Sequence, residues 1–431
     1  MHVVVLGAGI IGVSSAWYLR QAGHEVTVLE RQSGAALETS FANGGQLSTG
    51  HVEPWASPET FPQLLKWGFQ EDSPLLFRPR LDPRQWCWGL GFLRECWPAR
   101  SASNLSRLLQ LGLYSRSAHQ ALEQETGIAY HHLQRGIINL YSTPQDWQRG
   151  CRAAAAVARL GYVRQAWSKA QALAHEPALQ GAANLWAGAT FTPGDASGDA
   201  HVWTVALAHL CQAQGVNFRY QQQVTALVRQ GDQVTGVLLR PAEGAPRQET
   251  AQGPALTPPG YLAADAVVVA LGSYSPTLLA PLGIRIPVYP VKGYSATLRI
   301  LEPSLAPTCS ITDDAHKIVV TRLGAQLRVA GTAEFNGFDT RLNDQRCQAL
   351  LTRTQALFPG ACDMSQPQFW TGLRPATPSN YPLIGATRLR GLFLNTGHGT
   401  LGWTLGTGSG KALAEILCGR QPPVDVVFGD S

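Results

Sequence analysis

The sequence of 431 residues predicts an α/β fold in which a parallel sheet is interrupted by a second, largely antiparallel domain. Two observations lead to this prediction. Apolar runs typical of parallel strands covered on both faces occur at 3–6 and again at 266–271, far apart in the chain. From about 287 to 370, apolar and polar residues alternate instead, as in antiparallel strands with one face in a core. We therefore expect a discontinuous first domain, with a second domain built from its insertions.

The composition excludes several classes of protein. With 45% hydrophobic residues, the chain can bury a substantial core and is neither disordered nor fibrous. Its net charge of +5 comes from a chain that is only 15% charged, which is too dilute for a nucleic-acid partner. The eight cysteines show neither C-x-x-C pairs nor metal-finger spacing, so we interpret them as buried thiols and predict no metal site. No secretory signal or membrane-spanning stretch is evident, and we expect a cytoplasmic location.

A glycine-rich turn follows the first strand and opens the first helix. Gly7 permits the tight turn, Gly9 lets the backbone approach a pyrophosphate, and Gly12 lets the helix pack against the strand. The second strand, at 25–29, ends at Glu30, whose carboxylate suits the ribose hydroxyls of a dinucleotide. A glycine turn in a plain βαβ unit would not account for this acid. The pattern therefore predicts a Rossmann-like dinucleotide-binding unit.

The segment after Glu30 favours FAD over NAD. Arg31 comes next, and the small, polar loop at 39–46 can wrap a pyrophosphate and approach a flavin ring. An NAD-dependent enzyme would more often continue directly into another βα unit.

Two dense motifs lie near the C-terminus. The segment 370–378, WTGLRPATP, predicts a rigid turn of small residues that carries one arginine, Arg374. The segment 391–404 predicts a strand, a glycine loop and a helix that runs to about 417. A helix N-terminus so rich in glycine is a ready site for negative charge.

Five segments together closely resemble bacterial D-amino acid dehydrogenases, which belong to the flavoprotein superfamily of D-amino acid oxidase, glycine oxidase and sarcosine oxidase. They are the N-terminal turn and the segments 38–46, 288–295, 370–378 and 395–403, so the resemblance spans nearly the whole chain. It implies a Rossmann-like FAD-binding domain of the glutathione-reductase type, interleaved with an α+β substrate domain. Sarcosine oxidases carry a flavin-linked cysteine near Gly372, so we expect FAD to be bound noncovalently here.

The resemblance also sets the expected domains and cofactor contacts. The FAD-binding domain would comprise 1–55, 190–285 and 371–431, and the substrate domain 56–189 and 286–370. The residues expected to contact FAD are Val3, Gly7, Gly9, Ile10, Ile11, Gly12, Glu30, Arg31, Ser40, Asn43, Gly44, Gly45, Gln46, Val224, Gly272, Gly399, Thr400, Leu401 and Gly402.

Three residues are the candidates for substrate binding and catalysis. In relatives, the arginine that matches Arg374 binds the substrate carboxylate; the alternative is a structural salt bridge. His398 would relay a proton or merely cap its loop, and Tyr294 would line the pocket or be an ordinary strand aromatic. Glycine oxidase has a second arginine where this chain has Gly399-Thr400, so a second carboxylate clamp is not carried over.

The activity implied is oxidative deamination of a D-amino acid to a 2-oxo acid and ammonia. Hydride passes from the substrate Cα to flavin N5, water hydrolyses the imino acid, and electrons leave to a quinone-type or other acceptor. Three alternatives remain open. They are an oxidase of glycine or sarcosine, a dehydrogenase of D-proline or D-hydroxyproline, and a noncatalytic flavin-binding subunit of a larger complex.

Aromatic and basic residues gather between 55 and 97, where five of the twelve tryptophans lie. These are Trp55, Trp67, Trp86, Trp88 and Trp97, interleaved with Phe61, Phe69, Phe77, Phe92, Lys66, Arg78, Arg80, Arg84 and Arg94. Such a mixture suits a membrane interface, where a dehydrogenase would reduce quinone. One hypothesis is therefore peripheral attachment to the cytoplasmic face of the inner membrane; the other is that these rings pack the substrate domain.

Overall fold

The computed structural model describes residues 1–60, 73–244 and 260–426. A six-stranded sheet forms one half of the protein. All neighbouring strands are parallel except the first pair. The strands, in spatial order, are β19 (Leu383–Ala386), β20 (Leu392–Thr396), β13 (Ala266–Val269), β1 (His2–Leu6), β2 (Glu25–Leu29) and β9 (Asn217–Arg219). The two apolar runs are thus adjacent central strands, as a Rossmann-like unit requires.

A nine-stranded, mostly antiparallel sheet forms the other half. Its strands, in spatial order, are β18 (Gln368–Ala376), β14 (Tyr289–Arg299), β17 (Gln326–Phe335), β16 (Ile318–Leu323), β15 (Ser310–Asp313), β5 (Ile137–Tyr141), β7 (Gly188–Thr192) and β6 (Gln165–Trp167), with β4 (Leu75–Phe77) paired to β17. Only the β15–β5 and β17–β4 pairs are parallel. The fold class predicted from the sequence is confirmed.

Two small sheets complete the strands. One is the hairpin β10 (Gln222–Gln230) and β11 (Gln233–Pro241) with β12 (Gly260–Ala263), and the other pairs β3 (Gln46–Leu47) with β8 (Ala196–Ser197). The helices are α1 (Ile10–Gln21), α3 (Pro83–Glu95), α4 (Pro98–Thr126), α5 (Pro144–Arg159), α6 (Lys169–His175), α7 (Ala200–Ala213), α8 (Ser275–Leu279), α9 (Asp344–Leu357) and α10 (Gly402–Leu417).

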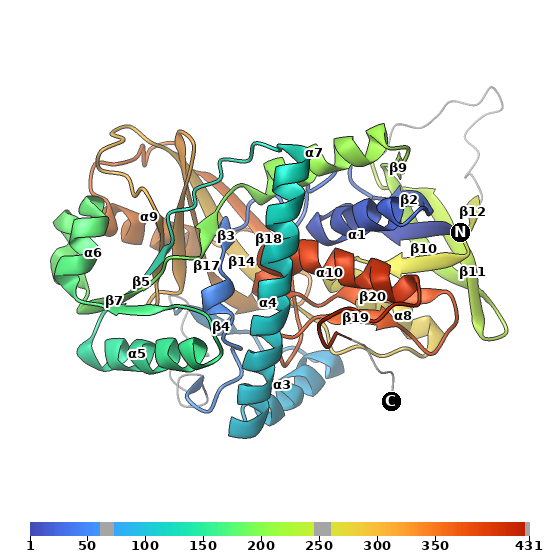
Figure 1. Ribbon diagram of the computed structural model, residues 1–431, viewed down its shortest axis with the longest axis horizontal. Helices are drawn as coiled ribbons and strands as arrows, with labels where there is room; N and C mark the ends of the chain where they lie inside the picture. The colour runs from blue at the N-terminus through green and yellow to red at the C-terminus, as the bar shows by residue number, and fades with distance from the viewer. Residues whose placement is uncertain (61–72, 245–259, 427–431) are drawn as a thin grey trace.

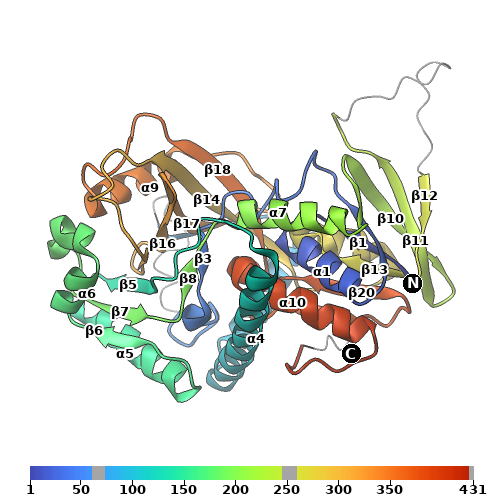
Figure 2. The same cartoon turned by 45° about the horizontal axis from the view of Figure 1, so that its top comes forward.

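The long helix α4 stands between the two halves (Figure 1), and α7, α1 and α10 lie together over the six-stranded sheet (Figure 2). Glycines let α10 approach its neighbours closely. A Cβ at Gly408 would come within 2.5 Å of the Ser115 backbone in α4, and one at Gly410 within 2.6 Å of the Ser14 backbone in α1. The C-terminal helix is therefore clamped between α1 and α4, which fixes its N-terminus beside the first glycine turn.

The prediction of a turn at 370–378 is wrong, because most of this segment is a strand. Residues 368–376 form β18, which pairs along its whole length with β14. Because β18 is an edge strand, it tolerates Pro375, which cannot donate to a ladder. Arg374 is thus held by a sheet and not by a loop.

The predicted domain boundaries remain a prediction, although two of them divide a strand. The boundary at 189/190 falls inside β7, and the boundary at 370/371 falls inside β18, both in the nine-stranded sheet. The cysteines are less uniformly buried than predicted. Cys96, Cys211, Cys309, Cys347 and Cys362 are buried, but Cys87 is exposed and Cys151 and Cys418 are half-buried.

The aromatic segment divides between core and surface. Trp88 and Phe92 are buried and pack against Tyr289 and Phe335, whereas Trp86 and Trp97 are exposed. Phe61, Lys66, Trp67 and Phe69 lie outside the described residues. Among the helices that the structure describes, none combines the length and the apolar character needed to cross a bilayer.

Candidate active site

A cavity of about 1650 Å³ runs between the two halves of the protein. It is larger than the roughly 300–1000 Å³ of a pocket for a drug-sized ligand, so it has room for a dinucleotide and a small substrate. Every predicted site residue lines it except Val3 and Gly12. Val3 is fully buried in β1 and Gly12 packs α1 against the glycine turn, so these two support the wall of the cavity and do not face it.

The glycine turn has the tight geometry that the sequence predicts. Gly7 has a φ of 101°, and a Cβ there would lie 2.7 Å from the carbonyl oxygen of Ala270. A Cβ at Gly12 would lie only 1.8 Å from the carbonyl oxygen of Gly7. Larger side chains at either position would force the turn away from the sheet.

Glu30 and Ser40 hold this turn from two sides. Glu30 accepts hydrogen bonds from the backbone N–H groups of Ala8 and Gln32, both at 2.8 Å. Burial raises the pKa of Glu30, against the lowering effect of these two bonds. Ser40 Oγ accepts a hydrogen bond from the N–H of Ile10 at 3.1 Å. Each carboxylate oxygen of Glu30 keeps acceptor capacity for a ribose hydroxyl.

The residues around the cavity fit FAD. Helix α1 is capped by Gly9 without a side-chain cap, and α10 also starts without one; neither helix has an acid in its first turn. Both N-termini therefore present positive dipole ends, which suit a pyrophosphate and the negative charge of a reduced flavin. In the loop before β3, Gly45 has a φ of 73° and donates its N–H to Asn43 Oδ1 at 2.9 Å, so its backbone can approach a flat ring.

Arg374 lines the cavity from β18 as a cation without a counter-ion among the described residues. Its Nη1 donates to the carbonyl oxygen of Thr332 at 2.6 Å. Burial, together with the like charge of Arg346, lowers the pKa of Arg374 to about 10, so it remains charged at neutral pH. Within the described parts of the chain no structural salt bridge uses this guanidinium, which leaves it suited to a ligand carboxylate.

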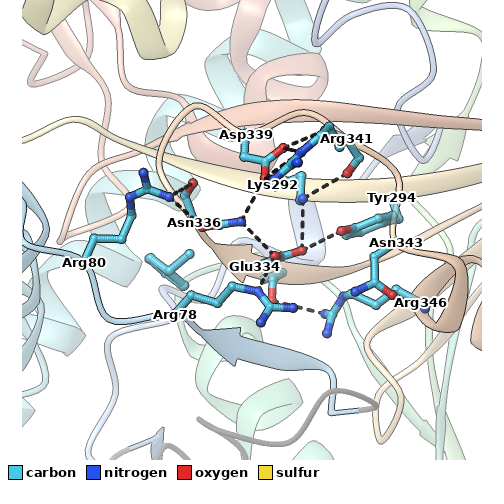
Figure 3. Close-up of polar contacts among 12 residues, drawn as sticks. Arg78, Arg80, Lys292, Tyr294, Glu334, Asn336, Asp339, Arg341, Asn343 and Arg346 are labelled. Atoms are coloured by element: carbon cyan, nitrogen blue, oxygen red, sulfur yellow. Dashed lines mark hydrogen bonds and ion pairs between the residues drawn. The ribbon is translucent and has the colours of Figure 1, made fainter.

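Tyr294 does not offer its hydroxyl to the cavity that its side chain lines. The hydroxyl donates to Glu334 Oε2 at 2.5 Å, and Glu334 also pairs with the buried Lys292 and the half-buried Arg78 (Figure 3). Burial and this carboxylate raise the pKa of Tyr294. We interpret the hydroxyl as part of the sheet's internal support.

His398 is buried with its ring turned toward α10. Its Nε2 lies 2.9 Å from Ser409 Oγ. Burial lowers the pKa of His398 to about 3, so the ring is neutral across the ordinary working range of an enzyme. This contact favours a structural role, and the predicted proton relay remains a hypothesis.

The pH dependence of activity tests that hypothesis. A group with a pKa of about 3 has already lost its proton well below pH 6, so we expect His398→Gln to leave the shape of the kcat profile from pH 6 to 9 unchanged. Steady-state rates with a D-amino acid across that range provide the measurement. Disappearance of one ionisation from the profile would restore the proton relay.

Several residues of the site escaped sequence reasoning. Gly293 and Thr332 contact Arg374, and the Trp370 indole lies against Gly372, where a Cβ would come within 2.0 Å of the ring. Gly293 lies in the segment 288–295, one of those on which the family resemblance rests, so the sequence offered a reason to consider it. The sequence offered no such reason for Thr332, because threonine does not indicate an unusual backbone conformation.

Comparisons with known proteins agree with this geometry. The family model described as FAD dependent oxidoreductase matches residues 2–416. The chain is 51% identical over 428 residues to a D-amino acid dehydrogenase of Dechloromonas aromatica, covering 99% of both chains. It is 46% identical over 427 residues to one of Paramagnetospirillum magneticum, covering 99% of this chain and 97% of the relative.

Solved structures share the fold at low identity. Glycine oxidase from Geobacillus kaustophilus has a TM-score of 0.74 at 24% identity, covering 100% of this chain and 98% of that one. L-proline dehydrogenase from P. horikoshii has a TM-score of 0.71 at 17% identity, covering 99% and 95%. The full-length family match, the close relatives and a cavity that fits FAD lead to one conclusion: the chain belongs to the FAD-dependent oxidoreductase family.

Proposed function

We propose that this chain is a D-amino acid dehydrogenase that converts D-amino acids to 2-oxo acids and ammonia and passes the electrons to a quinone-type acceptor. The observation that carries the proposal is the charged, half-buried Arg374, which lines the FAD-sized cavity without a counter-ion among the described residues. The two relatives above, both called D-amino acid dehydrogenase, support the substrate class. Noncovalent binding of FAD and the individual residue roles are part of this proposal.

FAD, when bound, supplies a two-electron acceptor that takes a hydride from the substrate Cα. The protein's own contribution is mainly positioning. Arg374 binds the substrate carboxylate through a two-pronged pair and thereby places Cα toward the ring. The backbone N–H groups at the start of α10 stabilise negative charge that develops beside them. His398, with a pKa of about 3, is too weak a base to take a proton near neutral pH, and the Tyr294 hydroxyl is hydrogen-bonded to Glu334. The substrate amine therefore reacts in its neutral form without a protein base.

The acceptor is tested by steady-state turnover. With D-amino acids as substrates, we expect 2-oxo acid to form rapidly with a soluble quinone analogue and slowly with oxygen alone. Equally rapid turnover on oxygen would favour an oxidase. No turnover and no flavin reduction by any D-amino acid would favour a noncatalytic flavin-binding subunit.

The proposal includes peripheral attachment to an anionic membrane, which is supported by one face of α3 together with Trp97, two residues past the end of that helix. Trp86, Leu90, Leu93 and Trp97 recur at helical spacing and are 51%, 69%, 43% and 72% exposed. The first three also line the cavity. Exposed arginines flank this face at positions 80, 84, 94 and 100. Tryptophan, leucine and arginine in this arrangement suit a lipid interface, which would bring a quinone to the cavity.

Vesicle flotation tests this attachment. We expect the protein to float with anionic vesicles at low salt and to do so less with zwitterionic ones. The double variant Leu90→Gln/Trp97→Gln should lose most of this binding. The control Leu301→Gln/Leu305→Gln, which removes two exposed apolar side chains away from this face, should retain it. Failure of the unmodified protein to bind anionic vesicles at low salt would reject the attachment.

A further inference from the structure

Arg374 reaches across a neighbouring strand to its hydrogen-bond partners. In the nine-stranded sheet, β14 lies between β18, which carries Arg374, and β17. The guanidinium nevertheless donates from Nη1 to the carbonyl oxygen of Thr332 on β17 at 2.6 Å. Its Nη2 lies 3.5 Å from the carbonyl oxygen of Gly331, on the same strand. The side chain therefore lies flat across β14.

Gly293 on β14 leaves the space for this crossing. A Cβ at Gly293 would lie 2.4 Å from Cζ of Arg374 and 2.5 Å from its Nη2. The φ of Gly293 is not in the left-handed region, so its backbone would accept other residues. What requires glycine here is the guanidinium above it.

A β-bulge on β17 presents the two carbonyl groups. The ladder pairs Lys292 with Glu334 and Tyr294 with Gly331, so Gly293 faces two residues, Thr332 and Ala333. Thr332 has a φ of 55°, which is rare for a β-branched residue and costs roughly 1–3 kcal/mol. Its N–H donates to the carbonyl oxygen of Lys317 at 3.2 Å, which holds the unusual conformation from the other side.

Glu334 fixes the end of the bulge. It accepts from Tyr294 at 2.5 Å and from Arg78 Nε at 2.8 Å, and it lies 3.2 Å from Lys292 Nζ (Figure 3). Burial alone would raise the pKa of Glu334, but these partners outweigh it and hold the pKa below its ordinary value. The ionised carboxylate thus ties β14, β17 and the chain at Arg78 together beside the bulge.

Backbone carbonyls orient a guanidinium without neutralising it. A carboxylate in the same place would form an ion pair with Arg374 and compete with an incoming ligand. Two carbonyl dipoles instead satisfy some of its five N–H donors and leave its net charge available.

We propose that Gly293 and the bulge at Gly331–Thr332 are positioning residues that set where Arg374 receives the substrate carboxylate. This inference rests on the proposed function, in which Arg374 binds that carboxylate. It assigns Gly293 and the bulge a role in substrate recognition through Arg374.

The substitution Gly293→Ala tests the proposal directly. The atoms in the way belong to the far end of a flexible side chain, so we expect the protein to fold and load FAD while the guanidinium moves off its carbonyls. The Kd of benzoate, an unreactive carboxylate, should rise about 10- to 100-fold, as for loss of a charge-assisted contact. KM for a D-amino acid should rise similarly, with a smaller change in kcat. Gly260→Ala, in a strand where no atom of the described residues lies within 4 Å of the added Cβ, is the matched control and should change neither.

A double-mutant cycle separates failure of this inference from failure of the proposed function. In an Arg374→Ala background, Gly293→Ala should add no further loss of benzoate binding, because it acts only through the arginine. If Arg374→Ala itself leaves benzoate binding unchanged, the proposed function fails. If Arg374→Ala weakens binding but Gly293→Ala changes it less than twofold, or still weakens it without Arg374, the positioning role is wrong.

A second variant tests the bulge independently. Asparagine adopts the left-handed conformation more readily than threonine, so Thr332→Asn should keep the carbonyl in place. We expect an unchanged or higher Tm and a benzoate Kd that rises far less than in Gly293→Ala. A tenfold loss of affinity in a folded, FAD-loaded Thr332→Asn protein would show that the backbone conformation is not what Arg374 depends on.

Discussion

Arg374→Ala is expected to lower kcat/KM for D-amino acids by about thirtyfold to several thousandfold. Truncating one partner of a buried, hydrogen-bonded charge pair costs roughly 2–5 kcal/mol, and each 1.4 kcal/mol is a factor of about ten. Arg374→Lys keeps the charge but loses the planar fork, and should cost about 10- to 100-fold. In both variants the loss should appear mainly as a raised KM, since the carboxylate is held from the first encounter onward.

The controls for this prediction are FAD content and an exposed arginine. Both Arg374 variants should retain FAD, because Arg374 contacts backbone groups of β17 and none of the glycine turns. Arg390→Ala, which removes an arginine from an exposed pair with Asp232, should leave kcat/KM unchanged. Unchanged KM in Arg374→Lys would mean that another group binds the carboxylate.

Gly12→Ala is expected to abolish FAD binding. The added Cβ would lie 1.8 Å from the carbonyl oxygen of Gly7, a backbone atom that cannot move without opening the turn. Overpacking of this kind costs typically 1–3 kcal/mol and sometimes more, and here it falls on the turn proposed to bind the pyrophosphate. The purified variant should lack the visible absorbance of flavin and unfold at a lower temperature.

Gly34→Ala is the matched control, because its nearest neighbour would be the flexible side chain of Leu37 at 3.6 Å. It should bind FAD as the unmodified protein does. A Gly12→Ala protein with a full complement of FAD and normal stability would contradict the assignment of this turn.

The sequence predicted the half with the six-stranded sheet well, because a dinucleotide-binding turn leaves marks at single residues. Positive φ at Gly7 and close approach at Gly12 both demand glycine, and the acid at the end of β2 is a further mark. The motif at 370–378 drew attention to Arg374, but it did not predict that this residue lies in a strand, β18. Gly372 and Pro375 indicate a turn, and only pairing with β14 at a sheet edge makes them residues of a strand.

Features set by long-range packing could not be predicted in this way. The bulge at Thr332 depends on β17 meeting β14 and β4, which are distant from it in the chain, and threonine gives no sign of a left-handed conformation. Similarly, the aromatic segment could be divided between core and surface only once α3 was known. The helix turns Trp88 and Phe92 inward and Trp86 and Leu90 outward.

Anaerobic reduction of the bound FAD by paired enantiomers tests the central claim most directly. We predict that D-amino acids bleach the flavin of the unmodified protein, that their L-enantiomers do not, and that bleaching requires far higher D-amino acid concentrations in Arg374→Ala. The comparison is informative because an L-proline dehydrogenase shares the fold. Bleaching by L-amino acids and not by their D-enantiomers, or by neither, would contradict the account.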